Sequence, residues 1–277
     1  MIVYPDAPEG FGSNGALECE RRLAAVGPFE FHVGPPSDPS VFLERVGAAK
    51  AIILGWSIPT DVLTGAPNLE LIAFTGIGAA NFVDLDVARE HGITVTNTPG
   101  YADRTVAEHT LALMLDASKN VSRLDRDTRA GGWNKAVPGM DLAGRTLGLV
   151  GFGGIAVEVA RLARAFGMRV IAWTRHAAAD RVGAKWVEFV ELSTLMSTSD
   201  IVSVHVALTP QTQNLLTAEL LGQLKDDAIF VNTARGEIID ESALVELLRA
   251  QRIRGAALDV FVDEPLSPDH VLRQFDN

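Results

Sequence analysis

The sequence contains a single cysteine, Cys19, and this scarcity excludes two kinds of structure. One thiol cannot form an internal disulfide, and it cannot supply the thiolate cluster of a zinc site. Such cysteine usage is typical of a reducing compartment, so we expect a cytoplasmic protein without a metal site. Cys19 itself is interpreted as a small hydrophobic residue buried in the core.

Long hydrophobic runs are also missing. The longest ones, such as residues 51–54, have the length of a strand, whereas about 20 apolar residues are needed to cross a bilayer. The chain opens with MIVYPDAPEG, in which no basic flank precedes a long apolar run, so no secretory signal is predicted. We therefore expect no membrane as a partner.

Basic residues are outnumbered, because 24 Lys and Arg face 35 Asp and Glu and leave a formal net charge of −11. This balance disfavours non-specific attraction to nucleic acid or to anionic lipid and favours a small-molecule ligand. The composition, 47% hydrophobic and 21% charged, is typical of a water-soluble globular protein. At about 150 residues per domain, 277 residues predict two domains.

Short β-branched runs alternate with helix-length amphipathic segments, first over residues 1–97 and again from the TLGLVG segment to the GAALDVF segment. Parallel neighbouring strands need a crossover connection, so this order predicts mostly parallel sheets covered on both faces. The turn residues NTPG at 97–100 precede residues 105–119, which predict a largely buried helix, and we place the linker at this turn. A further helix is expected around residues 215–224. The predicted fold class is α/β, with two doubly wound, Rossmann-like domains at 1–97 and 98–277.

The sharpest motif is GFGGIA at residues 151–156, which follows the strand TLGLV and opens a helix. Gly151 permits the tight turn, Gly153 lets backbone amides approach a pyrophosphate, and the small Ala156 lets the helix pack close to the strand. The amino terminus of that helix supplies unpaired N–H groups and the positive end of the helix dipole. The context therefore predicts a dinucleotide-binding loop in the second domain.

The next strand, over residues 169–174, ends without the acidic residue that usually holds the ribose hydroxyls of NAD. Thr174 and Arg175 stand there instead. A hydroxyl followed by a cation removes the repulsion against a 2′-phosphate and supplies a donor for it, so NADP is favoured over NAD. NAD stays open as the alternative.

Polar residues follow three further strands, at the rim where open α/β sheets bind ligands. His205 follows DIVSV, Arg235 follows AIFVNT, and Asp259 and Glu264 follow GAAL. Each residue alone has an ordinary alternative, such as a surface charge or a cap near a proline. A cation, carboxylates and an imidazole on one rim suit a carboxylate-bearing substrate held beside a nicotinamide.

These segments closely resemble the D-isomer-specific 2-hydroxyacid dehydrogenases, which include glyoxylate/hydroxypyruvate reductases and phosphoglycerate dehydrogenases. The similarity in the second domain lies in LGLVGFGGIA, DIVSVHVALTPQT, FVNTARGEIIDESALVELL and GAALDVFVDEPL, and in the first third and the linker in PNLELIAFTGIGAANFVDLD and VTNTPGYADRTVAEHTLALML. The resemblance implies that residues 1–97 form a flavodoxin-like substrate-binding domain and residues 98–277 an NAD(P)-binding Rossmann domain. It also implies a homodimer formed through residues 105–139.

The activity implied by the resemblance is hydride transfer between NAD(P)H and a small 2-oxo or 2-hydroxy acid. Arg235 matches the family arginine that engages the substrate carboxylate and carbonyl, and Glu264 matches the acid that raises the pKa of a partner histidine. The loop formed by Thr75, Gly76, Ile77 and Gly78 matches the one whose amides grip the substrate carboxylate. Asp259 matches the residue that holds the nicotinamide carboxamide. Cofactor contacts are expected from Gly151, Gly153, Gly154, Ile155, Thr174, Arg175, His205, Thr212, Thr233 and Asp259.

The sequence departs from the family pattern at three places. Ala207 stands where proline is usual, and Thr174 stands where NAD-using members carry an acid. The family's general acid/base, a histidine in a Thr-Pro-His segment, would lie just beyond Asn277, and His205 is the only other candidate on the rim. Loss of such a group costs about 10²–10⁴ in rate. The chain is either continued beyond Asn277 or truly shortened, and we favour continuation because the next strand of the family is missing.

Three functions remain open at this point. The main hypothesis is an NADP-preferring 2-hydroxyacid dehydrogenase that reduces glyoxylate, hydroxypyruvate or a related small 2-oxo acid. The alternatives are a phosphoglycerate dehydrogenase and a catalytically impaired protein that senses dinucleotides. Substrate selectivity is expected from the loops near Trp56, Ile77 and Tyr101.

Overall fold

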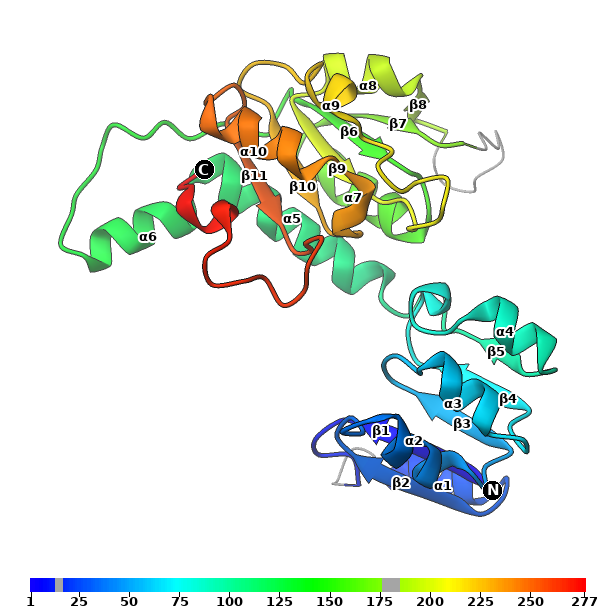
Figure 1. Cartoon of the computed structure of the whole chain (residues 1–277). Coiled ribbons are helices and arrows are strands. Elements are labelled where there is room, and N and C mark those ends of the chain that lie inside the picture. Colours follow the sequence, from blue (N-terminus) through cyan, green and yellow to red (C-terminus); the bar gives the residue numbers. More distant parts are fainter. Residues whose placement is uncertain (13–16, 176–184) are drawn as a thin grey trace. The chain divides into compact units, whose positions relative to one another are not determined.

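The computed structural model describes residues 1–12, 17–175 and 185–277 (Figure 1). Contacts divide the chain into two compact units, Met1–Tyr101 and Ala102–Asn277. The division falls a few residues beyond the boundary expected after residue 97. Each unit is built around a parallel sheet, which confirms the predicted α/β fold class.

Unit 1 alternates strands and helices from its first residues (Figure 1). Its described elements are β1 (Ile2–Ala7), α1 (Leu17–Ala24), β2 (Phe29–Val33), α2 (Pro39–Val46), β3 (Ala51–Leu54), α3 (Thr60–Gly65), β4 (Leu71–Phe74), the 3₁₀ helix η1 (Ala79–Asn81), α4 (Leu85–Glu90) and β5 (Thr94–Thr96). The sheet order is β2-β1-β3-β4-β5. This is the flavodoxin-like order, and the direction of chain progression reverses between β1 and β3.

Unit 2 begins with two consecutive helices and continues as a second alternating series. Its described elements are α5 (Asp103–Lys119), α6 (Val121–Arg129), β6 (Thr146–Val150), α7 (Gly154–Ala165), β7 (Arg169–Trp173), β8 (Glu188–Phe189), α8 (Leu192–Thr198), β9 (Ile201–Val204), α9 (Ala218–Leu221), β10 (Ile229–Asn232), η2 (Gly236–Ile238), α10 (Glu241–Arg249), β11 (Gly255–Leu258) and η3 (Val271–Gln274). The sheet order is β11-β10-β9-β6-β7-β8. That is the order of a Rossmann fold, whose ligand crevice lies where β6 and β9 meet.

Side-chain caps start several of the helices. The carboxylate of Asp38 accepts the N–H of Ser40 and of Val41 at the start of α2, at 2.9 and 3.1 Å. Asp84 caps α4 in the same way, and Asp240 caps α10. Because these side chains satisfy amides that have no acceptor inside the helix, they fix where the helices begin.

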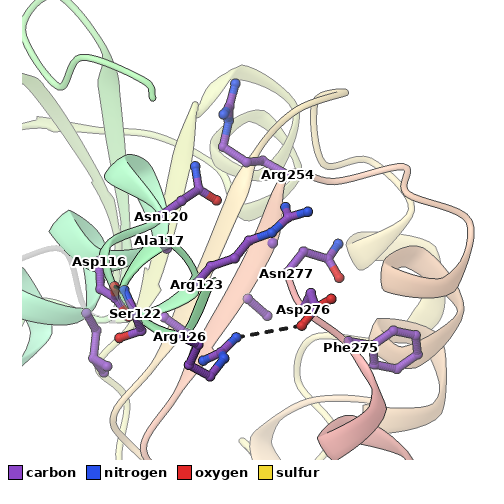
Figure 2. A pocket seen from close by; sticks show the side chains of 14 residues that line it. Asp116, Ala117, Asn120, Ser122, Arg123, Arg126, Arg254, Phe275, Asp276 and Asn277 are labelled. Atoms are coloured by element: carbon purple, nitrogen blue, oxygen red, sulfur yellow. Dashed lines mark hydrogen bonds and ion pairs between the residues drawn. The ribbon is translucent and has the colours of Figure 1, made fainter. Parts of the chain in front are cut away.

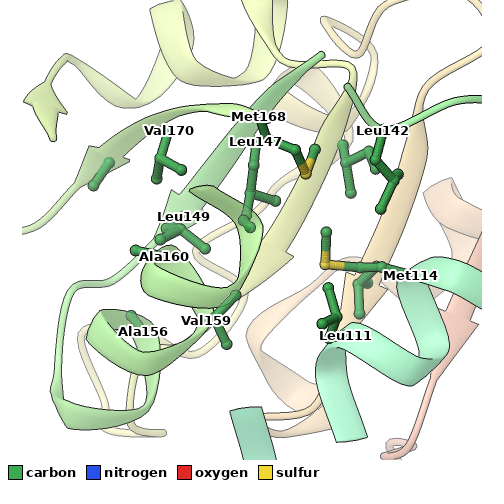
Figure 3. Packing of buried hydrophobic residues seen from close by; sticks show 14 of the residues in the cluster. Leu111, Met114, Leu142, Leu147, Leu149, Ala156, Val159, Ala160, Met168 and Val170 are labelled. Carbon is green, nitrogen blue, oxygen red and sulfur yellow. The ribbon is translucent and has the colours of Figure 1, made fainter. Parts of the chain in front are cut away.

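The core of unit 2 lies on both faces of its sheet. On one face, Leu111 and Met114 of α5 pack with Leu147 and Leu149 of β6 and with Val159 of α7 (Figure 3). The other face is covered by buried residues of α8, α9 and α10, which pack with Val202, Val204 and Phe230. Since both faces are covered, the strands read as nearly continuous apolar runs, which explains why they were visible in the sequence.

Some sequence interpretations were wrong. Cys19 is exposed rather than buried. The helix expected around 215–224 is reduced to α9, and α6 was not predicted because none of its residues is buried and it carries no apolar stripe. The helix at 105–119, interpreted as largely buried, places His109 on its exposed side.

Among the described helices, none has both the length and the apolar character needed to cross a bilayer.

Candidate functional site

The loop after β6 turns sharply at Gly151. This residue has φ +98°, a conformation that side-chain-bearing residues rarely adopt. A Cβ at this position would lie 2.7 Å from the carbonyl carbon and oxygen of His205, at the end of β9. Gly151 therefore permits both the turn and the close approach of the two strand ends at the topological switch point of unit 2.

The amino terminus of α7 is open to a ligand. Its N-cap residue, Gly153, provides no side-chain cap, and a Cβ added there would meet no atom within 4 Å. The N–H groups of Gly154, Ile155 and Ala156 have no acceptor among the residues that the structure describes. Ala156 is fully buried against the core, so the helix packs tightly on the sheet. Free amides, a positive helix end and an open glycine form a cradle that fits a pyrophosphate.

Gly154 has a structural role of its own. A Cβ at Gly154 would overlap the carboxylate of Asp103, the first residue of α5. The absence of a side chain therefore lets the start of α5 approach the start of α7. The sequence motif did not reveal this contact, because Asp103 and Gly154 are far apart along the chain.

The end of β7 presents Thr174 and an exposed Arg175. Nη2 of Arg175 donates to the carbonyl oxygen of Gln211 at 3.0 Å, so its guanidinium lies beside the loop that follows β9. Thr212, only 7% exposed, braces that loop, since its Oγ1 donates to the oxygen of Ala207 at 2.6 Å and accepts the N–H of Thr209 at 2.8 Å. Arg175 thus stands close to a braced loop beyond the strand ends.

His205 follows β9, and its ring is engaged within the fold. The ring Nε2 lies 2.9 Å from Oγ of the buried Ser203, and the backbone N–H of His205 donates to the backbone oxygen of Val150. Burial lowers the pKa of His205 to about 4. The imidazole is therefore uncharged at neutral pH, which makes it unsuited to replace the family's general acid.

Buried Asn232 organises the turn that carries Arg235. Its Nδ2 donates to the carbonyl oxygen of Arg235 at 2.9 Å, and its Oδ1 accepts the N–H of Ala234 at 3.0 Å. The backbone oxygen of Asn232 also accepts the N–H of Asp259, at 3.0 Å. Asn232 is fully buried, and its side chain holds the turn after β10 while its backbone oxygen links that strand end to the end of β11. Its role was not predicted from the sequence, where it looks like an ordinary strand residue.

Helix α5 contributes two contacts that sequence analysis also missed. Nε2 of His109 lies 3.3 Å from Oδ1 of Asp259, and Oγ1 of Thr110 lies 3.0 Å from Oγ1 of Thr233. Residues 109 and 110 therefore reach the ends of β11 and β10. Only the packing of α5 across the sheet brings these four residues together.

Glu264 is exposed, and its Oε1 accepts the N–H of Phe261 at 3.0 Å. The segment it belongs to packs against Gly236, where a Cβ would overlap the backbone of Phe261 and Val262. The loops that carry Arg235 and Glu264 are therefore in contact. None of the described histidines forms an ion pair with Glu264. His270, the nearest to it in the sequence, pairs with Glu241 instead, with Nε2 3.2 Å from Oε1.

The loop at 75–78 belongs to unit 1 and follows β4. Its carbonyl groups are occupied, because Oγ1 of Thr98 donates to the oxygen of Thr75 at 2.8 Å and Nδ2 of Asn97 donates to that of Ile77 at 2.6 Å. The N–H groups of residues 76–78 have no acceptor in the described part of the chain. Amides that are free while the carbonyls are tied form a turn suited to a carboxylate.

A pocket of about 220 Å³ lies elsewhere in unit 2 (Figure 2). It is lined by the end of α5, the start of α6, residues 275–277 and the amino end of β11. Arg126 forms an ion pair with Asp276 there, at 3.7 Å. Because the candidate site residues follow the carboxyl ends of the strands, this pocket is separate from them.

Comparison with known proteins gives consistent results. The family model described as D-isomer specific 2-hydroxyacid dehydrogenase, NAD binding domain, matches residues 111–277. A glyoxylate reductase of Korarchaeum cryptofilum is 40% identical over 250 residues, which cover 88% of this chain and 75% of that protein. A D-3-phosphoglycerate dehydrogenase of Archaeoglobus fulgidus is 38% identical over 221 residues, which cover 79% of this chain and 42% of that protein.

Solved structures are similar over nearly the whole chain. An acyclic imino acid reductase in complex with NADPH and D-Arg has a TM-score of 0.87 and 28% identity, and the match covers 99% of this chain and 86% of that one. A formate dehydrogenase of Staphylococcus aureus, solved with NAD, has a TM-score of 0.82 and 30% identity, over 99% and 85% of the two chains. These neighbours support a nicotinamide dinucleotide as the cofactor.

We expect Gly151→Ala to destabilise unit 2 by about 2–4 kcal/mol, because the new Cβ would meet backbone atoms of His205 at a positive φ. Gly153→Ala is the matched control in the same loop. Its φ of −92° suits alanine and its surroundings are open, so the change should stay within about 0.5 kcal/mol. Urea unfolding of both variants measures this difference, and equal stability of the two would contradict the role given to Gly151.

Proposed function

The chain belongs to the D-isomer-specific 2-hydroxyacid dehydrogenases, and from this premise we propose that it is an NADPH-preferring reductase of small 2-oxo acids. The family consists of oxidoreductases that act on the CH–OH group of 2-hydroxy acids with a nicotinamide dinucleotide. The observation that carries the proposal is the cradle at the start of α7, where three amides lack acceptors in the described structure beside an open Gly153. Backbone donors at a helix amino terminus suit the diphosphate of such a cofactor.

We propose that the cofactor is held by Gly151, Gly153, Gly154 and Ile155 at its diphosphate. Thr174 and Arg175 would hold the adenosine end, and a guanidinium beside a hydroxyl favours a 2′-phosphate. Further contacts are proposed from His205, Thr212 and Thr233, with Asp259 accepting an N–H of the nicotinamide carboxamide. When bound, the reduced nicotinamide would supply a hydride for C2 of the 2-oxo acid, and one proton from solution would complete the hydroxyl group.

The substrate would be bound through its carboxylate and carbonyl. In unit 1, the free amides of residues 76–78 are the donors proposed for the carboxylate, and Thr75 starts that loop. In unit 2, Arg235 offers a planar fork of donors, and Asn232 holds its backbone. Arg235 is proposed to polarise the carbonyl, and Glu264 to match the acid that, in the family, stabilises the charged form of the histidine that donates the proton.

The direct test is oxidation of NADPH, followed by absorbance, with glyoxylate, hydroxypyruvate and 3-phosphohydroxypyruvate. We expect turnover with the first two acids, and Arg235→Gln should lower kcat/KM by about 10²–10³ because a charge-assisted donor to the reacting carbonyl is lost. The control is Arg161→Gln on α7, where the arginine pairs with Glu158 at the surface. It should leave kcat/KM unchanged within about 3-fold.

Two outcomes of this assay favour the alternatives. Faster reduction of 3-phosphohydroxypyruvate than of the other acids would identify a phosphoglycerate dehydrogenase. Binding of NADPH with no turnover of any acid would indicate a protein that senses the dinucleotide.

Cofactor preference is tested by Arg175→Ala. We expect the Kd for NADPH to rise by about 10–100-fold, since a hydrogen bond to a charged group is lost, and the Kd for NADH to change little. Quenching of protein fluorescence measures both constants. The control is Arg169→Ala at the start of β7, because the guanidinium of Arg169 pairs with Glu188. An equal loss of affinity for both cofactors would show that Arg175 only braces the Gln211 loop.

We further propose a homodimer formed through residues 105–139. Helix α6 buries none of its residues within the chain, and Val121 and Trp133 are 57% and 78% exposed. Sedimentation should give twice the chain mass of 29.6 kDa, and Val121→Ser with Trp133→Ser should shift the equilibrium toward one copy. Val26→Ser, at an 80% exposed position of unit 1, is the control. A parent protein that sediments as a single copy contradicts the proposal.

A further inference from the structure

A buried carboxylate lies at the topological switch point of unit 1. Asp6 stands near the carboxyl end of β1 and is only 9% exposed. Its two oxygens accept the N–H of Gly55, at 3.0 and 3.1 Å, and Oδ2 also accepts the N–H of Trp56 at 2.7 Å. Asp6 thereby ties the end of β1 to the first residues after β3.

This arrangement carries an energetic penalty. Burial raises the pKa of Asp6, while the backbone amides and the Arg45 guanidinium act in the opposite direction. Removing a carboxylate from water is unfavourable unless hydrogen bonds compensate for the lost hydration. The compensation here comes mainly from the amides of Gly55 and Trp56, so the carboxylate and the loop conformation depend on each other.

The loop that Asp6 holds presents an exposed aromatic ring. Trp56 is 64% exposed, and its indole contacts the ring of Phe82, with the two ring centroids 5.3 Å apart. Phe82 in turn stacks on Phe74 at 5.0 Å. The loop is also anchored further on, where the N–H of Ile58 donates to the oxygen of Phe82 at 3.0 Å. The backbone of Gly55 and Trp56 is the part of the loop that is bonded to Asp6.

The same loop lies beside the one with free amides. Leu54 at the end of β3 pairs with Phe74 at the end of β4, and the N–H of Thr75 donates to the oxygen of Leu54 at 2.9 Å. Residues 55–56 and 75–78 therefore leave neighbouring strands at the same edge of the sheet. A 2-oxo acid whose carboxylate is held at 76–78 would direct its side chain toward neighbouring loops such as this one.

We propose that Asp6 is a positioning residue that fixes the Gly55–Trp56 backbone so that the Trp56 indole contacts an apolar side chain of the 2-oxo acid. The inference rests on the proposed function. It predicts that a 2-oxo acid with an apolar substituent binds more tightly than glyoxylate, which has none. An exposed indole supported by a stacked aromatic pair gains contact area in proportion to the apolar surface of the substituent.

The main experiment compares Asp6→Asn with the parent protein on glyoxylate and phenylpyruvate. The amide NH₂ of asparagine cannot accept from a backbone N–H, so at least one bond to the loop is lost. We expect the KM for phenylpyruvate to rise about 10-fold and that for glyoxylate to stay within about 3-fold, with kcat and the Kd for NADPH nearly unchanged. Equal rises for the two acids, or a changed Kd for NADPH, would overturn the proposal.

Two further variants separate positioning from general stability. Asp84→Asn is the matched control, because Asp84 also accepts two backbone amides in unit 1, at the start of α4, and its loss should alter stability without altering substrate preference. Gly55→Ala disturbs the same loop with the carboxylate intact, since its Cβ would lie 3.2 Å from Oη of Tyr4 and 3.5 Å from Oδ2 of Asp6. It should shift the preference in the same direction as Asp6→Asn.

A second readout needs no substrate. The fluorescence of Trp56 is obtained by subtracting the signal of the matching Trp56→Phe variant from that of each protein. Its quenching by acrylamide should increase in Asp6→Asn and stay constant in Asp84→Asn. Unchanged quenching in Asp6→Asn overturns the positioning role. If quenching changes but no 2-oxo acid is reduced, Asp6 holds the loop and the proposed function, together with the substrate class, is wrong.

Discussion

The candidate site depends on backbone N–H groups that have no acceptor among the residues that the structure describes. Both sheets are parallel, so within each sheet the strands end at the same edge. The chain leaves these strand ends through turns before it enters the next helix. At the start of α7 and in the loop at 75–78, these turns leave consecutive amides free while neighbouring carbonyls are bonded. Such amides attract anions.

Buried polar groups hold the loops that neighbour these amides. In unit 2, the buried side chain of Asn232 holds the turn of Arg235 and its backbone receives the N–H of Asp259. In unit 1, the buried carboxylate of Asp6 holds the residues after β3. Both groups are polar, buried and hydrogen-bonded to backbone atoms of loops. These bonds fix the conformation of each loop relative to the sheet.

The fold and much of the site could be predicted, because their signals are local. Apolar runs separated by helix-length segments indicated parallel sheets, and the glycines at 151 and 153 lie within one strand-turn-helix unit. The contact of His109 with Asp259 could not be predicted, since the two residues are distant in the sequence and the helix was interpreted as largely buried. Helix α6 was missed because no residue in it faces a core.

The amino-acid sequence by itself determined the two α/β regions, the glycine loop and the family to which the chain belongs, because period, turn chemistry and motif spacing act over short stretches. Tertiary structure decided which polar groups hold the loops. Asp6 with Trp56, Asn232 with Asp259 and Asp103 with Gly154 meet only through strand order and helix packing. A hydrogen bond depends on positions in space to within tenths of an ångström, and those positions follow from the packing of whole elements.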